Sequence, residues 1–384
     1  MKKKTVFTAA AIVAGNGIGS GVMAIPYFVS KTGAVGGAIA FLTAYLISVL
    51  LHLMIAQIML TMGETLDILG AFNVYLFRGK LKNILKISFF IIMVIVLETN
   101  LAAYITGASA IMAEFFPGIS EKLLGTAFFV FAAAVVLLGL RAICIGENVT
   151  VSIMATILLV ALFFSFRNIN PAISIENAGL DATGLLRFAA TYSMIMFSFS
   201  AIFAVPQVIE CLDHDEARVR KSIFLGLLMN LVISVVITVC TIITSKEVTK
   251  VAIVGWADAV GGVIRILGSL FIILAMFTSY WSIGFATTEI ISNQTQKTFG
   301  LSFVLATVPA LLLTFLLSNG FMEYMKLAGG AVAVIISLMV IPTYLIATKG
   351  QKTSIMTPAE ASKASVAIVF IMYIVMAVGS LISV

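Results

Sequence analysis

Apolar runs of about 20 residues, the length at which a helix crosses the hydrocarbon core of a bilayer, recur along the entire chain. Of 384 residues, 61% are hydrophobic and only 10% are charged, which is too little charge to cover a soluble domain. The net charge of +6 does not indicate nucleic-acid binding, because the cations lie in short loops between apolar runs. We therefore predict an all-α polytopic membrane protein embedded in the lipid bilayer.

The apolar runs predict eleven membrane-spanning helices. Their expected ranges are 5–30, 33–60, 87–116, 121–140, 147–166, 185–210, 221–244, 261–292, 300–318, 326–347 and 365–384. With the N-terminus in the cytoplasm, 15 of the 23 Lys and Arg residues fall on the inner side, as the positive-inside rule requires. An odd number of spans then leaves the C-terminus outside the cell membrane. The longest connector, 61–86, is expected to be partly helical.

Two halves of the chain repeat one another. The segment SGVMAIP at 20–26 has the same pattern as SAIFAVP at 200–206, and the same 180-residue offset superposes several further spans. Five spans separate each matching pair, so the halves enter the membrane in opposite directions. The sequence thus predicts an inverted repeat, with repeat one over about 5–166, repeat two over about 185–347 and an additional helix over about 365–384.

The first span contains the segment GNGIGSG at 15–21, with four glycines in seven positions. Glycine permits an unwound backbone, and unwound backbone survives in a membrane only where protein buries it or a cavity solvates it. A break exposes N–H groups that suit a carboxylate and carbonyls that suit Na⁺ or an ammonium group. Paired breaks of this kind form substrate sites in transporters. The alternative is a GxxxG packing surface, and we favour the broken helix because 196–207 in span six supplies a partner break.

These segments resemble the amino acid–polyamine–cation (APC) superfamily of transporters. GNGIGSGVMAIPY is similar to its first span, and most similar to those of the amino acid/auxin permeases and the hydroxy/aromatic amino acid permeases; AMFTSYWSIGFATTE at 275–289 is similar to span eight of the latter. The resemblance implies a LeuT-like 5+5 inverted repeat with an additional eleventh helix and with helices 1 and 6 broken. Ile202 and Ser200 depart from the aromatic permeases, which argues against an aromatic substrate.

The first span also resembles that of neurotransmitter:sodium symporters. In that family backbone carbonyls of span one and an A-x-x-T-S segment of span eight bind Na⁺. The resemblance implies that the Na⁺ ligands here are Gly15, Ile18, Ala275, Thr278 and Ser279. Oxygen ligands suit this hard cation. Thr and Ser within spans often bond their own backbone instead, and the aromatic permeases share the T-S pair although they are regarded as proton-coupled.

The same resemblance places the substrate between the two breaks. Its carboxylate is expected on the N–H groups near Gly19, Ser20 and Gly21, and its amine on carbonyls near Gly17 and near Phe197, Ser198 and Phe199. From the residues alone, Tyr104 lies one helical turn after Asn100 in span three, and we expect it to reach the substrate.

One carboxylate stands out within the predicted spans. Glu98 lies near the middle of span three, where an ionisable group is costly and is a functional candidate by default. It is our candidate for proton coupling, and a structural role bonded to a neighbouring helix is the equal alternative.

Together these features predict a secondary active transporter, a symporter of small amino acids coupled to Na⁺ or, alternatively, to H⁺, working by alternating access. We expect no enzyme activity and no cofactor, because no nucleophile–base set or metal-ligand cluster is evident. The alternative is a permease-like ligand-sensing subunit of a membrane receptor, of the germinant-receptor type. No sequence feature indicates an oligomeric state.

Overall fold

The protein is a bundle of α-helices, seen here in a computed structural model that describes residues 5–63, 67–170, 179, 181–316, 331–350 and 354–382, of which Ser20 and 331–336 are described by backbone alone. The helices that meet the predicted spans are α1 (Val6–Ile18) with α2 (Ile25–Thr32), α3 (Ala34–Met62), α5 (Lys82–Phe115), α6 (Glu121–Leu137), α7 (Leu140–Arg167), α8 (Ala182–Ser198) with α9 (Ala204–Cys211), α10 (Glu216–Thr244), α12 (Gly262–Thr295), α13 (Phe299–Leu316), α15 (Ala331–Ala347) and α16 (Lys363–Ser380).

Within the described residues, two short helices lie in connectors. As expected, the connector 61–86 is partly helical, with α4 at Ile68–Tyr75, and a second connector contains α11 at Ala252–Val260. A single 3₁₀ turn, η1 at Ser20–Met23, separates α1 from α2.

Seven helices of the described residues are long and apolar enough to cross a membrane, and the bent pair of the first span makes eight. The other three predicted spans correspond to α6, to α8 with α9, and to α15, whose single helices are shorter than the 18 residues of a full crossing. The outer faces of the bundle are apolar, as along α5, where Ile84, Ile87, Ile91 and Ile95 are exposed. A contiguous apolar exterior is what a lipid-facing surface requires.

Helix starts follow from local sequence. Side-chain oxygens of Thr5, Ser120, Asp181, Asp215 and Ser362 each accept a hydrogen bond from the backbone N–H three residues on, at the starts of α1, α6, α8, α10 and α16. Pro26 lies in the first turn of α2, where its missing N–H costs nothing.

Among the described helices, the largest difference from a predicted boundary is at the start of span five. Span five was expected from residue 147, but α7 begins at Leu140, after Gly139 with a φ of 79°. The charged Arg141 and the polar stretch around Glu147 depress the local hydropathy although the backbone there is helical. Glu147 consequently lies about two turns inside the helix.

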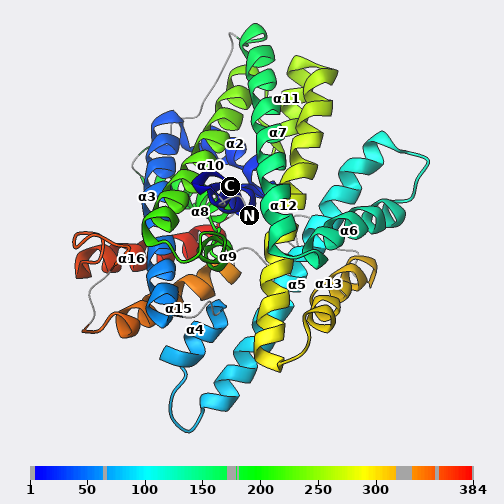
Figure 1. The fold of residues 1–384 in the computed structure, drawn as a ribbon. Coiled ribbons are helices and arrows are strands. Elements are labelled where there is room, and N and C mark those ends of the chain that lie inside the picture. Colours follow the sequence, from blue (N-terminus) through cyan, green and yellow to red (C-terminus); the bar gives the residue numbers. More distant parts are fainter. Residues whose placement is uncertain are drawn as a thin grey trace.

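The broken first span lies inside the bundle. α1 packs against α10, α7, α12 and α9, and η1 packs against α8. In Figure 1 the dark blue α1, beside the N label, is surrounded by these helices, whereas α5, α6 and α13 form one flank and α3, α15 and α16 the other. A break in α1 is therefore covered by protein on its sides, which is the condition for irregular backbone at membrane depth.

Candidate functional site: the paired helix breaks

The first predicted break is present, and it is shorter than the glycine segment suggests. Gly15 and Gly17 stay helical within α1, and the backbone leaves the helix only at Gly19, whose φ is 34°. The axes of the two halves differ in direction by 58°. Ser20 begins the 3₁₀ turn, Gly21 lies within it, and the buried Ile18 is the last residue of α1.

Gly15 and Gly17 have a packing role instead of unwinding. A Cβ atom on Gly17 would collide with the Asn230 amide nitrogen and would lie 3.0 Å from the carbonyl oxygen of Ser198. A Cβ on Gly15 would collide with the Glu147 carboxylate. The segment thus combines both of the interpretations open from the sequence: a break at Gly19, and close approach by neighbouring side chains at the two earlier glycines.

The second break is also present, although the segment contains no glycine. α8 ends at Ser198, and the chain stays out of regular helix from Phe199 to Phe203 before α9 begins. Phe199 is fully buried at this break.

One amide connects the two breaks. Asn230 of α10 donates from Nδ2 to the Ser198 carbonyl oxygen at 2.6 Å while it contacts Gly17. A second contact joins the breaks at Gly21, where a Cβ would lie 3.0 Å from Cδ1 of the Phe197 ring. The structure therefore brings together Gly17, Gly21, Phe197 and Ser198, as the sequence predicts for a substrate site.

Several polar atoms at the breaks have no hydrogen-bond partner among the described residues. They are Nδ2 of Asn16, Oγ of Ser198 and Oδ1 of Asn230, all in buried side chains. A buried polar group without a partner costs about 1–3 kcal/mol. Unpaired donors and an acceptor on residues around the two breaks are what a polar ligand bound between the breaks would satisfy.

Tyr104 of α5 reaches the same break. A Cβ on Gly19 would lie 3.8 Å from the Tyr104 hydroxyl oxygen and 3.5 Å from Oγ of Ser279. Tyr104 is buried beside the break, and its role at the substrate stays a prediction.

Four of the five residues predicted as Na⁺ ligands are in contact. The Thr278 hydroxyl donates to the carbonyl oxygens of Gly15 at 3.0 Å and Ala275 at 2.9 Å. The Ser279 hydroxyl lies 3.2 Å from the Gly15 carbonyl oxygen and 3.3 Å from that of Asn16. The carbonyls of Gly15 and Asn16 belong to the last turn of α1, where backbone oxygens lack helical partners because the helix breaks.

Glu98 lies apart from this group. It is half-buried on α5, six residues before Tyr104, so the two side chains are about 120° apart around the helix. Asn100, one turn before Tyr104, is buried. The proton-coupling role of Glu98 therefore stays a prediction.

Two residues at the site were missed from the sequence: Asn230 and Glu147. Each is a polar side chain inside an apolar span. That feature alone could have identified each as a functional candidate, as it identified Glu98. The faces of α10 and α7 that contact α1 are set by packing between distant spans. No short-range sequence pattern predicts which faces these are.

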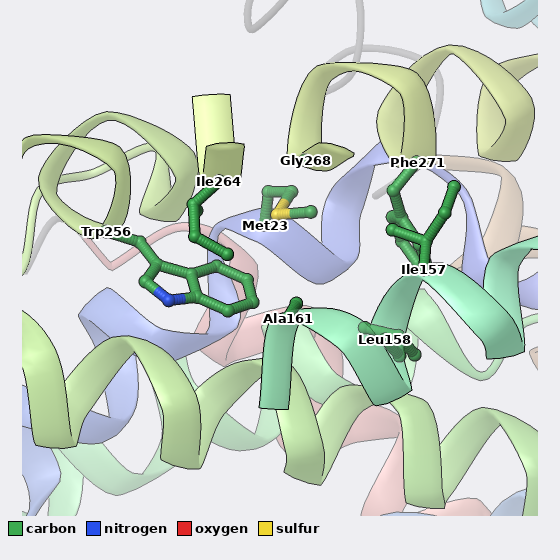
Figure 2. Close-up of a pocket in the computed structure, with 8 residues that line it drawn as sticks. All are labelled: Met23, Ile157, Leu158, Ala161, Trp256, Ile264, Gly268 and Phe271. Atoms are coloured by element: carbon green, nitrogen blue, oxygen red, sulfur yellow. The ribbon is translucent and has the colours of Figure 1, made fainter. Parts of the chain in front are cut away.

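A small apolar pocket lies beside the first break (Figure 2). Met23 of η1 lines it together with side chains of α7, α11 and α12: Ile157, Leu158, Ala161, Trp256, Ile264 and Phe271, with Gly268 between them. Trp256 is held in place by a 2.9 Å hydrogen bond from its ring nitrogen to Oγ of Ser165. The pocket adjoins the break. None of the described residues that line it is one of the predicted substrate residues.

The fold resembles solved transporter structures. The nucleobase–cation symporter Mhp1, in a closed conformation with bromovinylhydantoin bound, superposes with a TM-score of 0.68 at 13% identity, over 98% of this chain and 90% of that one. A manganese transporter of Eremococcus coleocola, in complex with an aromatic bis-isothiourea compound, superposes with a TM-score of 0.62 at 15% identity, over 98% of this chain and 85% of that one. These likenesses confirm the LeuT-like fold with an additional helix.

Comparison by sequence identifies the family. No curated protein matches the chain. Residues 2–381 match the tryptophan/tyrosine permease family. A permease family together with the fold indicates an APC-type multi-pass membrane transporter rather than an enzyme, and it does not favour the sensor alternative. The chain therefore belongs to the tryptophan/tyrosine permease family.

Proposed function

We propose that this protein is a symporter of small amino acids, which binds its substrate between the two helix breaks. The observation that supports this most directly is the position of Asn230, which bonds the Ser198 carbonyl at one break while it contacts Gly17 at the other. A ligand between the breaks would meet unpaired donors and acceptors from both repeats.

The main-chain groups of an amino acid suit this arrangement. Its carboxylate would accept from N–H groups after Gly19, where the 3₁₀ turn begins a new helical segment and presents free donors. Its ammonium group would donate to carbonyl oxygens at Gly17 and at Phe197 to Phe199, and to Oδ1 of Asn230. Tyr104 would contact the substrate from α5.

Two classes of amino acid substrate, small and aromatic, differ in the side chain that the site would have to accept. Ile202 and Ser200 at the second break favour small amino acids, whereas the name of the family makes tryptophan and tyrosine the competing class.

Coupling to Na⁺ is proposed through Gly15, Ile18, Ala275, Thr278 and Ser279. The contacts of Thr278 and Ser279 with the Gly15 carbonyl support it, because hydroxyls and carbonyls that converge in a buried site are ready ligands for a hard cation. Coupling to H⁺ through Glu98 is the alternative.

Counterflow in proteoliposomes tests substrate choice without any assumption about the driving ion. Liposomes loaded with unlabelled alanine, serine, tryptophan or tyrosine are diluted into trace amounts of the same labelled amino acid. We expect transient accumulation with alanine or serine. Accumulation with tryptophan and tyrosine alone would refute the small-substrate proposal, and no accumulation with any amino acid would refute the substrate class.

A further inference from the structure

Glu147 is a fully buried carboxylate that neither the predicted site nor the family match explains. It lies on α7, with 0% of its surface exposed, and neither carboxylate oxygen has a hydrogen-bond partner among the described residues. A buried carboxylate either takes up a proton or is paired with a cation or a metal, because the charged form is so costly to transfer out of water. The unpaired oxygens of Glu147 are therefore a place where a proton or a positively charged ligand would be stabilised.

The carboxylate faces the last turns of α1. The position that a Cβ atom would take on Gly15 is occupied by Oε2 of Glu147, with Cδ of Glu147 2.7 Å away. The same position is 3.0 Å from Cβ of Thr278. Glu147 and Thr278 thus meet at Gly15 from different helices, and only glycine leaves room for both.

The carbonyl of Gly15 is already the centre of a group of oxygens. The hydroxyls of Thr278 and Ser279 lie 3.0 and 3.2 Å from it, and the Ala275 carbonyl lies 2.9 Å from the Thr278 hydroxyl. All these oxygens are neutral. The described part of α1 contains no charged residue, so the helix itself offers Glu147 no counter-charge.

We propose that Glu147 is the charged ligand of the cation site formed by Gly15, Ala275, Thr278 and Ser279. Its carboxylate supplies the full negative charge that offsets the dehydration of a hard monovalent cation such as Na⁺, while the carbonyls and hydroxyls complete the oxygen shell. This inference rests on the proposed coupling site and adds a third helix, α7, to it. Cation binding then ties α7 and α12 to the end of α1 that adjoins the break.

The test is Na⁺ binding by the purified full-length protein in detergent, with Na⁺ alone as the ligand. The unfolding temperature is measured as NaCl replaces choline chloride at constant ionic strength, and the apparent Kd is taken from the titration. Wild type is compared with Glu147→Gln, which removes the charge, and with Glu147→Asp, which keeps the charge and shortens the side chain. Glu289→Gln is the matched control, because this half-buried carboxylate lies on α12 about 15 Å beyond Ser279 along the helix.

We expect Na⁺ to raise the unfolding temperature of wild type and of Glu289→Gln alike. In Glu147→Gln the apparent Kd for Na⁺ should rise by about tenfold or more, as when one charged partner is lost from a buried pair. Glu147→Asp should fall between the two, and it keeps the test open should the glutamine variant fail to fold. A Kd in Glu147→Gln equal to that of wild type would overturn the proposal, as would the lack of any Na⁺ effect on wild type.

The two experiments together distinguish rejection of the Glu147 cation site from rejection of the proposed amino acid transport. Substrate counterflow without a Na⁺ effect would reject Glu147 as a cation ligand and leave amino acid transport standing. Na⁺ binding that depends on Glu147 without counterflow of any amino acid would support the cation site and reject the proposed substrate.

Discussion

Replacing Gly17 with alanine tests whether α1 and α10 meet as closely as the structure indicates. Gly17 lies within α1, and in an ordinary helix this substitution would stabilise by about 1 kcal/mol, because alanine is the better helix former. Here the new methyl group would collide with the Asn230 amide and lie 3.0 Å from the Ser198 carbonyl oxygen. The sign of the effect is therefore diagnostic.

The expected magnitude follows from three contributions. Overpacking a tight contact costs about 1–3 kcal/mol. Displacing Asn230 loses its 2.6 Å hydrogen bond to Ser198, worth about 1 kcal/mol. Subtracting the helix-propensity gain leaves a net destabilisation of roughly 1–3 kcal/mol, which in a chain of 384 residues corresponds to a fall in unfolding temperature of about 1–4 °C.

Thermal unfolding of the purified variants in detergent measures this directly. Gly300→Ala is the control, because Gly300 lies in α13 with no atom near the position of its would-be Cβ. We expect that control to unfold at the wild-type temperature or slightly above. Asn230→Ala should relieve the collision, so that the double variant Gly17→Ala/Asn230→Ala loses less stability than the two single effects sum to.

Two results would refute this reasoning. One is a Gly17→Ala protein as stable as Gly300→Ala, which would mean that α1 and α10 are farther apart at the break. The other is simple additivity of Gly17→Ala and Asn230→Ala, which would mean that the two residues are not in contact.

Three further outcomes are expected. Gly19→Val should abolish substrate binding in an equilibrium binding assay and leave the protein folded, because a β-branched residue is strained at a φ of 34° and covers the N–H groups of the break; unchanged affinity would contradict the site. Thr278→Ala with Ser279→Ala should remove Na⁺ dependence of uptake, since both hydroxyls at the Gly15 carbonyl are lost; retained dependence would exclude them as ligands. Glu360→Gln should remove the part of the stability that depends on its ion pair with Arg220, whose 2.7 Å hydrogen bond holds the pKa of Glu360 below its usual 4.5. That contribution is present above pH 4.5 and is lost as the pH falls through the lowered pKa, so wild type and variant should converge in unfolding temperature at acid pH; a constant difference at every pH would contradict the assignment.

The sequence predicted the architecture well because its signals are local. Hydropathy located the spans, and the glycine segment at 15–21 with its counterpart at 196–207 predicted both breaks. The extent of the first break was less predictable: glycine permits unwinding and close packing equally, and only the neighbours at Gly15 and Gly17 show that packing applies there.

The geometry of the candidate site was predictable where it depends on the backbone breaks, and it was missed where it depends on side chains from distant spans. The contact of Thr278 and Ser279 with Gly15 followed from a family resemblance. Asn230 and Glu147 meet α1 from α10 and α7, and the rotation of those helices about their axes is set by tertiary packing. Hydropathy also placed the start of α7 seven residues too late, which left Glu147 at the edge of a predicted span.

The most direct test of the central claim is amino acid uptake into proteoliposomes that carry an inward Na⁺ gradient or, separately, an inward H⁺ gradient. The account predicts accumulation of a small amino acid above its external concentration under the Na⁺ gradient, abolished when an ionophore collapses that gradient. Accumulation under the H⁺ gradient alone would move coupling to Glu98. Binding of an amino acid without accumulation under either gradient would contradict the account, because a site between the two breaks would then recognise a ligand that the protein does not transport.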